Sequence, residues 1–392
     1  MFRRLTIAAR YRYLSISRAY AKHEYAPILE SICETFDEAE SVKMTEAYRS
    51  TQKDRVNFLY NHKGVDQLPK DCLSTLETPD VTNILSLETS DHNENIGMIA
   101  TSHYKKGEIT IWSIESKGEQ ENVHEPSDDV KKYATGSFRM DYTWHMSKFL
   151  NQDYLLSSYP YPGFKVINWR NGKLESNVKF IQPGPLSEGS KNAMLGFATD
   201  YCIIGCRNGS VSFYNRTQNK LIRTISNLHT NYVRSLQYLP SLDHFVSAGM
   251  DGNIHIIDIS SGKVVRSIQA HSHWVSSITS LDENTICTTS GDKTARIWNV
   301  ATGELLHSLE SHTGRINQVL FLGGDYIATA SDDKYIFLWD WKKGVQVGGL
   351  VGHKDHVKNI ILMSNNRIVS SSLDGTMKVW GIKETDDANV NK

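Results

Sequence analysis

The C-terminal half of this chain repeats every 41 residues, and no other feature of the sequence constrains the fold as strongly. An aspartate stands six residues before one shared position of each repeat, and a histidine stands 21 or 22 residues before each aspartate. A fixed period of about 40 to 45 residues with a strand-like run ending in Trp-Asp is typical of a propeller blade. The shared position is occupied by Ile257, Trp298, Trp339 and Trp380.

Three less regular segments precede these repeats, and their strand-like runs end near Trp112, Trp169 and Tyr214. We therefore expect an all-β fold, a seven-bladed β-propeller over residues 71–383. Insertions or long loops are expected among the first three blades, because the distance from Trp112 to Trp169 is 57 residues. Residues 115–135 are charged enough to form a solvated loop there.

The segment 71–77 resembles the outermost strand of a repeat, although no blade precedes it. The last repeat stops just after Trp380 and lacks such a strand. We expect residues 71–77 to complete the last blade, so that the ring closes by hydrogen bonds between the two ends of the propeller and leaves no unpaired edge there.

The propeller is flanked by segments of different composition. Residues 21–70 are predicted to form an extension, partly helical or a linker, and apolar residues recur at helical spacing from Ile28 to Phe36. Residues 384–392 are predicted to be a disordered tail. The pattern leaves two readings of 21–68 open, a docking helix and a solvated spacer.

The first 20 residues contain five arginines and no acidic residue, with an imperfect apolar face on a helical wheel. An Arg-rich, acid-free amphipathic start is typical of a mitochondrial presequence. Arg18, followed by Tyr20 and Ala21, matches the pattern at which matrix processing cuts, so the mature chain is predicted to begin at Tyr20 or Ala21. The alternative is a basic, disordered arm of a cytoplasmic or nuclear protein.

Overall composition excludes several classes of function. The 43 basic and 44 acidic side chains nearly cancel, so the whole chain offers no positive field for a nucleic-acid backbone. The five cysteines are odd in number and scattered, which favours a reducing compartment. No apolar run approaches the roughly 20 residues of a membrane span, and no glycine-rich phosphate loop follows a strand. We expect no cofactor and no membrane span.

The repeats resemble the WD-repeat family of β-propellers over about residues 71–383. In that family a histidine, a Ser or Thr, the turn aspartate and the tryptophan form a hydrogen-bonded chain that locks each blade. The resemblance assigns an incomplete set to His229, Ser247 and Asp251, because Ile257 takes the tryptophan place, while Lys106, Gly163 and Asn208 occupy the aspartate place earlier. The complete sets are His271, Thr288, Asp292 and Trp298; His312, Thr329, Asp333 and Trp339; and His353, Ser370, Asp374 and Trp380.

These sets contain the residue types of a catalytic triad, but their repetition at a fixed period with a tryptophan indicates a structural role. A hydrolase needs one such constellation beside oxyanion donors. We therefore expect no enzyme activity. We also expect no metal site, since Cys202 and Cys206 lie four residues apart in a predicted strand, too far for one tetrahedral ion, and His273 stands alone.

The resemblance also implies a partner-binding face. In the family, the residue three after the histidine often points onto the top face, and the residue before the turn aspartate lies nearby. Tyr, Trp and Arg are enriched in interface hot spots. The predicted partner-binding residues are Tyr232, Trp274, Arg315 and His356, together with Met250, Asp332 and Leu373.

The sequence thus predicts a non-catalytic scaffold for protein–protein interactions, a monomeric propeller within a multiprotein assembly of the mitochondrial matrix. One alternative is a cytoplasmic or nuclear adaptor or substrate receptor that uses residues 21–68 as a docking segment. Another is an RNA-associated propeller, for which a local basic cluster is required. The candidates for that cluster are Lys131, Lys132, Lys342, Lys343, Lys354 and Lys358.

Overall fold

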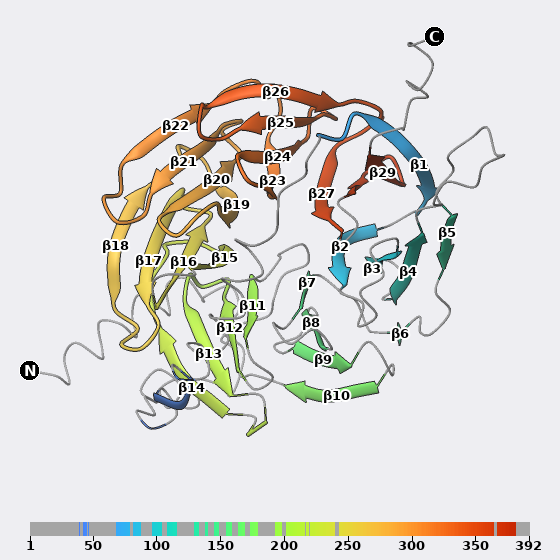
Figure 1. Cartoon of the computed structure of the whole chain (residues 1–392). Helices are drawn as coiled ribbons and strands as arrows, with labels where there is room; N and C mark the ends of the chain where they lie inside the picture. The colour runs from blue at the N-terminus through green and yellow to red at the C-terminus, as the bar shows by residue number, and fades with distance from the viewer. Residues whose placement is uncertain are drawn as a thin grey trace, which may run out of the picture.

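The computed structural model shows antiparallel sheets arranged in a ring, as Figure 1 shows. The ring is built almost entirely of strands from residue 71 onward. The described residues are 39, 42–44, 46, 68–78, 81–87, 96–103, 108–115, 129–132, 138–139, 145–148, 154–158, 164–168, 173–178, 193–197, 201–215, 217–218, 220–239, 243–363 and 367–381.

The strands follow one another in chain order within most sheets. The N-terminal part of the ring contains β1 (Asp71–Glu77), β2 (Val81–Leu87), β3 (Ile96–His103), β4 (Glu108–Glu115), β5 (Asp129–Lys132), β6 (Phe138–Arg139), β7 (His145–Lys148), β8 (Tyr154–Ser158), β9 (Phe164–Asn168), β10 (Lys173–Val178), β11 (Met194–Phe197), β12 (Tyr201–Gly205), β13 (Val211–Asn215) and β14 (Lys220–Ile225). The C-terminal part contains β15 (Val233–Leu239), β16 (His244–Gly249), β17 (Asn253–Asp258), β18 (Val264–Gln269), β19 (Val275–Ser280), β20 (Thr285–Ser290), β21 (Ala295–Asn299), β22 (Leu305–Leu309), β23 (Ile316–Gly323), β24 (Tyr326–Ser331), β25 (Ile336–Asp340), β26 (Val345–Leu350), β27 (Val357–Leu362), β28 (Ile368–Ser372) and β29 (Thr376–Gly381).

The prediction of a seven-bladed propeller is wrong, because only six of the described sheets are four-stranded blades. Among the described residues, six sheets are regular four-stranded blades, whereas the sheet of β2, β3, β4 and β5 has a fifth strand, β6. Both β5 and β6 pair with β4, β5 opposite residues 112–115 and β6 opposite residues 108–109. The outer edge of this sheet is therefore divided between two short strands. Residues 129–132, which we expected inside a loop, form β5.

The closing strand lies where the sequence predicts it. Strand β1 pairs antiparallel with β29, with Asp71 opposite Gly381 and Glu77 opposite Thr376, and a bulge interrupts the register after Cys72. Figure 1 shows β1 beside β29, the two ends of the propeller in one sheet. The last sheet, in the order β1, β29, β28 and β27, thus gains its outer strand from the start of the domain.

The core lies between neighbouring sheets rather than inside any one sheet. The second strands of the four repeats, β16, β20, β24 and β28, are buried along nearly their whole length. One apolar cluster joins Val246 and Ile256 of one repeat to Ile278 and Trp298 of the next. Small and β-branched residues suit such strands, because both faces pack closely against a neighbouring sheet.

The turn after each repeat's aspartate requires a left-handed residue. Gly252 and Gly375 fill this position with φ of 80° and 78°, and Lys293 and Lys334 adopt the same conformation with φ of 74° and 79°. A side chain at Gly252 would meet the backbone oxygen of His271. The turn is thus set by geometry that glycine adopts without strain and that the two lysines adopt at a cost.

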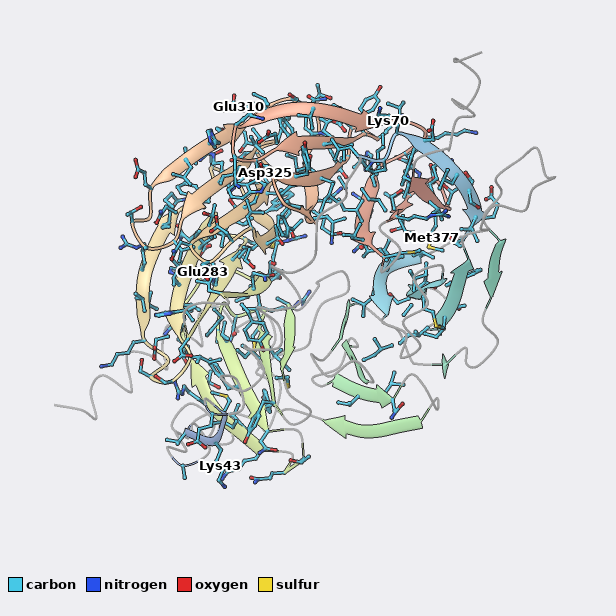
Figure 2. The ribbon with its side chains drawn as sticks, in the orientation of Figure 1. Lys43, Lys70, Glu283, Glu310, Asp325 and Met377 are labelled. Atoms are coloured by element: carbon cyan, nitrogen blue, oxygen red, sulfur yellow. The ribbon has the colours of Figure 1, made fainter. Side chains whose placement is uncertain are left out.

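The extension before the propeller contacts it through Met44, and Leu68 and Lys70 contact the last sheet just before β1. Residues 42–44 are helical, and Met44 is fully buried in an apolar cluster with Phe213 and Ile222 of the β11–β14 sheet. Figure 2 places the adjacent Lys43 beside this sheet. This helical segment therefore packs against the chain's own propeller. No helix of the described residues has the length and hydropathy of a membrane span.

Candidate functional site

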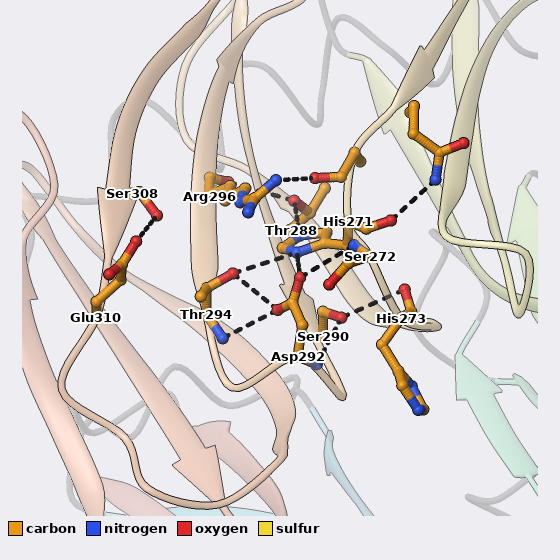
Figure 3. Close-up of polar contacts among 12 residues, drawn as sticks. His271, Ser272, His273, Thr288, Ser290, Asp292, Thr294, Arg296, Ser308 and Glu310 are labelled. Carbon is orange, nitrogen blue, oxygen red and sulfur yellow. Dashed lines mark hydrogen bonds and ion pairs between the residues drawn. The ribbon is translucent and has the colours of Figure 1, made fainter.

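Each of the last three repeats contains a hydrogen-bonded chain of four side chains, which we call the blade lock. In the β19–β22 sheet, His271 Nδ1 lies 2.9 Å from Asp292 Oδ2 and His271 Nε2 lies 2.8 Å from Thr288 Oγ1. The indole N–H of Trp298 donates to the same hydroxyl at 2.9 Å. Figure 3 shows His271 between Thr288 and Asp292. The lock ties the histidine before the first strand to the second strand, the turn and the third strand.

The next two repeats have the same geometry. His312 lies 2.7 Å from Asp333 and 2.8 Å from Thr329, and Trp339 donates to Thr329 at 2.9 Å. In the last repeat, the corresponding contacts join His353 to Asp374 at 2.9 Å and to Ser370 at 2.7 Å, and Trp380 donates to Ser370 at 2.7 Å. The structure thus brings together all four members of each complete set predicted from the sequence.

The lock aspartates carry the charge of the network. Burial by itself raises their pKa, but hydrogen bonds from the histidine and from backbone N–H groups outweigh this effect and lower it, for Asp333 to about 2 and for Asp292 below its usual range. The carboxylate is therefore ionised at neutral pH. The lock histidines have side chains 0–1% exposed, so a substrate has no access to them. This burial favours the structural role over a hydrolytic one.

Earlier sheets retain fragments of the lock that sequence reasoning missed. The indole N–H of Trp112 donates to Thr101 Oγ1 at 2.9 Å, which reproduces the tryptophan–hydroxyl half of the lock. In the β11–β14 sheet, Asn208 Oδ1 accepts from the backbone N–H of Ser210 at 3.0 Å, and Gly209 follows with φ of 79°. Asn208 therefore forms the same turn as the aspartates. The sequence already indicated this turn, because Asn208 occupies the aspartate place and Asn can replace Asp as an acceptor in such turns.

The β15–β18 sheet has the incomplete lock. His229 Nδ1 lies 3.0 Å from Asp251 Oδ1, and His229 Nε2 lies 2.9 Å from Ser247 Oγ, but Ile257 supplies no indole donor. His255 lies beside His229, with ring centroids 4.5 Å apart. Burial and the charge of His229 lower the pKa of His255 to about 4, although Asp251 acts in the opposite direction. We had expected no ligand cluster, and His255 was not singled out.

The predicted partner-binding residues form adjacent pairs on one rim. In each of the four repeats, the residue before the turn aspartate donates its backbone N–H to the carbonyl of the residue three after the histidine. The four bonds are Met250 to Tyr232 at 2.8 Å, Gly291 to Trp274 at 3.1 Å, Asp332 to Arg315 at 2.9 Å and Leu373 to His356 at 3.0 Å. The two predicted positions thus belong to one surface in every repeat.

Trp274 occupies the centre of this rim. The guanidinium of Arg315, from the next sheet, lies 4.8 Å from its ring centroid, and that of Arg234, from the preceding sheet, lies 6.0 Å away. His273 packs edge-on at 3.8 Å. Burial lowers the pKa of Arg234. Within the described residues, neither guanidinium has a carboxylate within 4.0 Å, so the positive charge around Trp274 is not neutralised by an ion pair.

The neighbouring part of the rim is internally paired. Asp332 accepts hydrogen bonds from Asn317 and Lys358, and His356 Nδ1 lies 3.4 Å from it. This network holds the pKa of Asp332 below its usual range despite burial, chiefly through Lys358 and Asn317. Leu373 is 56% exposed beside it. At the other end of the rim, the guanidinium of Arg207 lies 5.0 Å from the ring of Tyr232.

Three of the six basic residues considered for RNA binding form ion pairs with carboxylates. Lys342 pairs with Asp325 at 2.6 Å, Lys343 pairs with Asp340 at 2.7 Å, and Lys358 pairs with Asp332. Lys131 and Lys132 lie in β5, on the irregular sheet. Three of the candidate lysines thus have their charge balanced by a neighbouring carboxylate, which removes the support for RNA binding from this part of the chain.

Other predicted positions fall elsewhere. Cys202 and Cys206 are buried in or next to β12, and neither forms a disulfide bond with another described residue. The predicted processing positions Arg18, Tyr20 and Ala21, the presequence 1–20 and the tail 384–392 lie outside the described residues.

Comparisons with known proteins agree with this geometry. Residues 303–340 and 344–381 match the WD domain, G-beta repeat family, and residues 198–282 match the anaphase-promoting complex subunit 4 WD40 domain family. The crystal structure of the WD40 β-propeller domain of Doa1 superimposes with a TM-score of 0.62 at 15% identity, over 80% of this chain and 97% of that chain. The chain contains WD40 repeats and folds as a WD-repeat β-propeller.

Sequence relatives match over short segments. The DENN domain and WD repeat-containing protein SCD1 of Arabidopsis thaliana is 30% identical over 24% of this chain and 8% of its own length. Nuclear distribution protein nudF 1 of Talaromyces marneffei is 29% identical over 28% of this chain and 24% of its own length. WD repeat-containing protein 1 of Gallus gallus is 32% identical over 24% of this chain and 16% of its own length. The chain thus spans less than a quarter of these relatives.

We predict that Asp333→Ala lowers the free energy of unfolding by about 1–3 kcal/mol, because it leaves the buried His312 and the backbone N–H of Thr313 without their acceptor. Denaturant unfolding measures the effect. Asp325→Ala is the matched control, since it removes a carboxylate from a half-exposed pair with Lys342 and should change stability by less than about 1 kcal/mol. Equal losses in the two variants would contradict the role of the lock.

Proposed function

We propose that this WD-repeat propeller is a non-catalytic scaffold that binds a protein partner through the rim centred on Trp274. Proteins of this class generally bind other proteins in complexes. The observation that supports this surface is the arrangement of Trp274 between Arg234 and Arg315, contributed by three neighbouring sheets. Tryptophan and arginine are the residue types that dominate interface hot spots, because each buries a large area and retains a polar group.

The charge of the rim indicates the chemistry of the partner. Two guanidinium groups flank the indole, and neither has a carboxylate within salt-bridge reach among the described residues. A partner segment that places an Asp or Glu beside an apolar or aromatic side chain would bind both features, because arginine forms bidentate hydrogen bonds with carboxylates. We therefore propose an acidic partner segment with at least one large apolar residue.

Trp274→Ala and Arg315→Ala should each weaken partner binding by about tenfold or more, because truncation of a hot-spot residue costs at least about 2 kcal/mol. Co-purification from cells identifies the partner, and titration of the purified pair gives the affinity. Glu310→Ala, a substitution in the β22–β23 connection away from Trp274, is the control and should leave affinity unchanged. Thermal stability should also remain nearly unchanged, because Arg315 is exposed and Trp274 is only partly buried. Unaltered capture by both variants would contradict the proposal.

We further propose that the scaffold acts in the mitochondrial matrix, in the assembly or expression of a complex there. The support is the Arg-rich, acid-free segment 1–20 and the Arg18-Ala19-Tyr20-Ala21 junction. The competing proposal is a cytoplasmic or nuclear adaptor that docks through residues 21–68. The burial of Met44 against the β11–β14 sheet disfavours that role for the described part of the segment, because this side chain already has a partner.

Determination of the endogenous N-terminus tests the location. A start at Tyr20 or Ala21, with resistance to protease until the inner membrane of isolated mitochondria is lysed, is the expected result. An intact Met1 in a cytoplasmic pool would contradict import and would favour the adaptor, with the rim still available to its partner.

A further inference from the structure

The incomplete lock of the β15–β18 sheet gathers three metal-ligand side chains. One ring nitrogen of His229, one carboxylate oxygen of Asp251 and one ring nitrogen of His255 all lie within 4.8 Å of one another. Asp251 is 3.0 Å from His229 through Oδ1 and 3.2 Å through Oδ2. In a tetrahedral zinc site with bonds of about 2.0–2.1 Å, neighbouring ligand atoms are about 3.3 Å apart. Two of the three ligands are thus already near the required separation.

The rings of both histidines are held by hydrogen bonds to serine hydroxyls. Nδ1 of His255 lies 2.8 Å from Ser267 Oγ, and Nε2 of His229 lies 2.9 Å from Ser247 Oγ. This leaves Nε2 of His255, which is buried and has no hydrogen-bond partner among the described residues. A metal-bound histidine is usually oriented by a hydrogen bond to its other ring nitrogen, as both of these are.

The carboxylate is positioned by the backbone. Asp251 Oδ2 accepts from the N–H of Thr230 at 3.0 Å, and Oδ1 accepts from the N–H of Asn253 at 3.1 Å. The side chains of His229 and Asp251 are 0% and 7% exposed. Two of the three candidate ligands are therefore fixed in position and largely shielded from water, and His255 is partly buried beside them.

The other repeats lack the third ligand. The place of His255, two residues before the tryptophan position, is taken by Arg296, Phe337 and Lys378. Arg296 directs its guanidinium to the carbonyl of Ala270 at 2.7 Å, as seen in Figure 3, and Phe337 stacks on His312 with centroids 4.3 Å apart. A histidine replaces these residues only in the repeat where Ile257 replaces the tryptophan.

The missing tryptophan also changes the protonation that the lock can adopt. In the complete locks, an indole N–H occupies one acceptor position of the Ser or Thr hydroxyl. Ser247 receives no indole donor, so its oxygen is open to an N–H from His229 Nε2. That tautomer leaves a lone pair on Nδ1 for a metal ion. Without the ion, Nδ1 donates its proton to Asp251, so metal binding requires that this proton moves to Nε2 or leaves the site.

We propose that His229, Asp251 and His255 bind a divalent transition-metal ion, with zinc as the ion of choice, and that the ion takes over the stabilising role of the absent tryptophan in this sheet. Two imidazole nitrogens with one carboxylate suit zinc and its neighbours better than magnesium or calcium, which prefer oxygen ligands. Three protein ligands leave one tetrahedral position for water.

The test uses the full, tag-free chain after removal of metal with a chelator. Titration with Zn²⁺ against a chromophoric chelator should show one tight equivalent, and Co²⁺ should produce the visible absorption of a tetrahedral site. Zn²⁺ at about 100 times its Kd should raise the Tm by about 3 °C or more. Absence of tight Zn²⁺ binding by the wild-type chain would overturn the proposal.

His255→Phe supplies the decisive comparison, because phenylalanine occupies the same place in the repeat of Phe337. It should weaken Zn²⁺ binding by about 100-fold or more and abolish the metal-dependent rise in Tm. His255→Gln serves the same purpose if the phenylalanine variant does not fold. His307→Phe, which removes an outer-strand histidine bound to the carbonyl of Lys342, should bind Zn²⁺ as the wild type does. Equal affinity in the His255 variant and the wild type would place the ion elsewhere and refute the site.

Discussion

The hydrogen-bonded blade lock is the interaction on which the regular part of this propeller depends. Backbone hydrogen bonds join neighbouring strands of a sheet, but they do not link the histidine before the first strand to the turn and the third strand. The lock joins these elements through a buried histidine whose two ring nitrogens are both paired. An unpaired nitrogen in that position would cost about 1–3 kcal/mol, so each member of the lock requires the others.

The burial of the lock explains why the exposed residues of the rim differ between repeats. Because the lock is buried, its polar residues are unavailable to partners, and the exposed residues next to it are free to vary from repeat to repeat. Tyr232, Trp274, Arg315 and His356 occupy equivalent positions, yet each makes different contacts. A rigid, periodic frame thus presents a non-periodic rim, which is the property that a binding scaffold needs. In the incomplete lock around His229, the buried residues themselves differ, because Ile257 replaces the tryptophan and His255 lies beside the histidine.

Periodicity allowed much of the structure to be predicted. The 41-residue repeat located the members of the complete locks and the paired rim positions, and the orphan segment 71–77 predicted the closing strand that pairs with β29. The repeat could not predict the divided edge formed by β5 and β6, because that sheet departs from the period. Nor could it reveal His255 as a candidate ligand, since the relevant fact is the distance between two side chains that lie 26 positions apart in sequence.

The contacts of Trp274 were equally beyond sequence reasoning. The repeat predicted that Trp274 lies on the rim. The two guanidinium groups come from adjacent sheets, and only the assembled ring brings Arg234 and Arg315 to the same indole. By contrast, the lysines considered for RNA binding looked unpaired in the sequence. Their ion pairs form across loops and between sheets, as with Lys358 and Asp332.

A double-mutant cycle on one complete lock tests the central claim most directly. Thr288→Val and Asp292→Ala each remove one partner of His271, and the free energy of unfolding is measured for both single variants and the double variant. If the four side chains act as one unit, the double variant loses less stability than the sum of the single losses, with a coupling energy of about 0.5–3 kcal/mol. Additive losses within about 0.3 kcal/mol would show that the contacts contribute independently and would contradict the account of the lock as one unit.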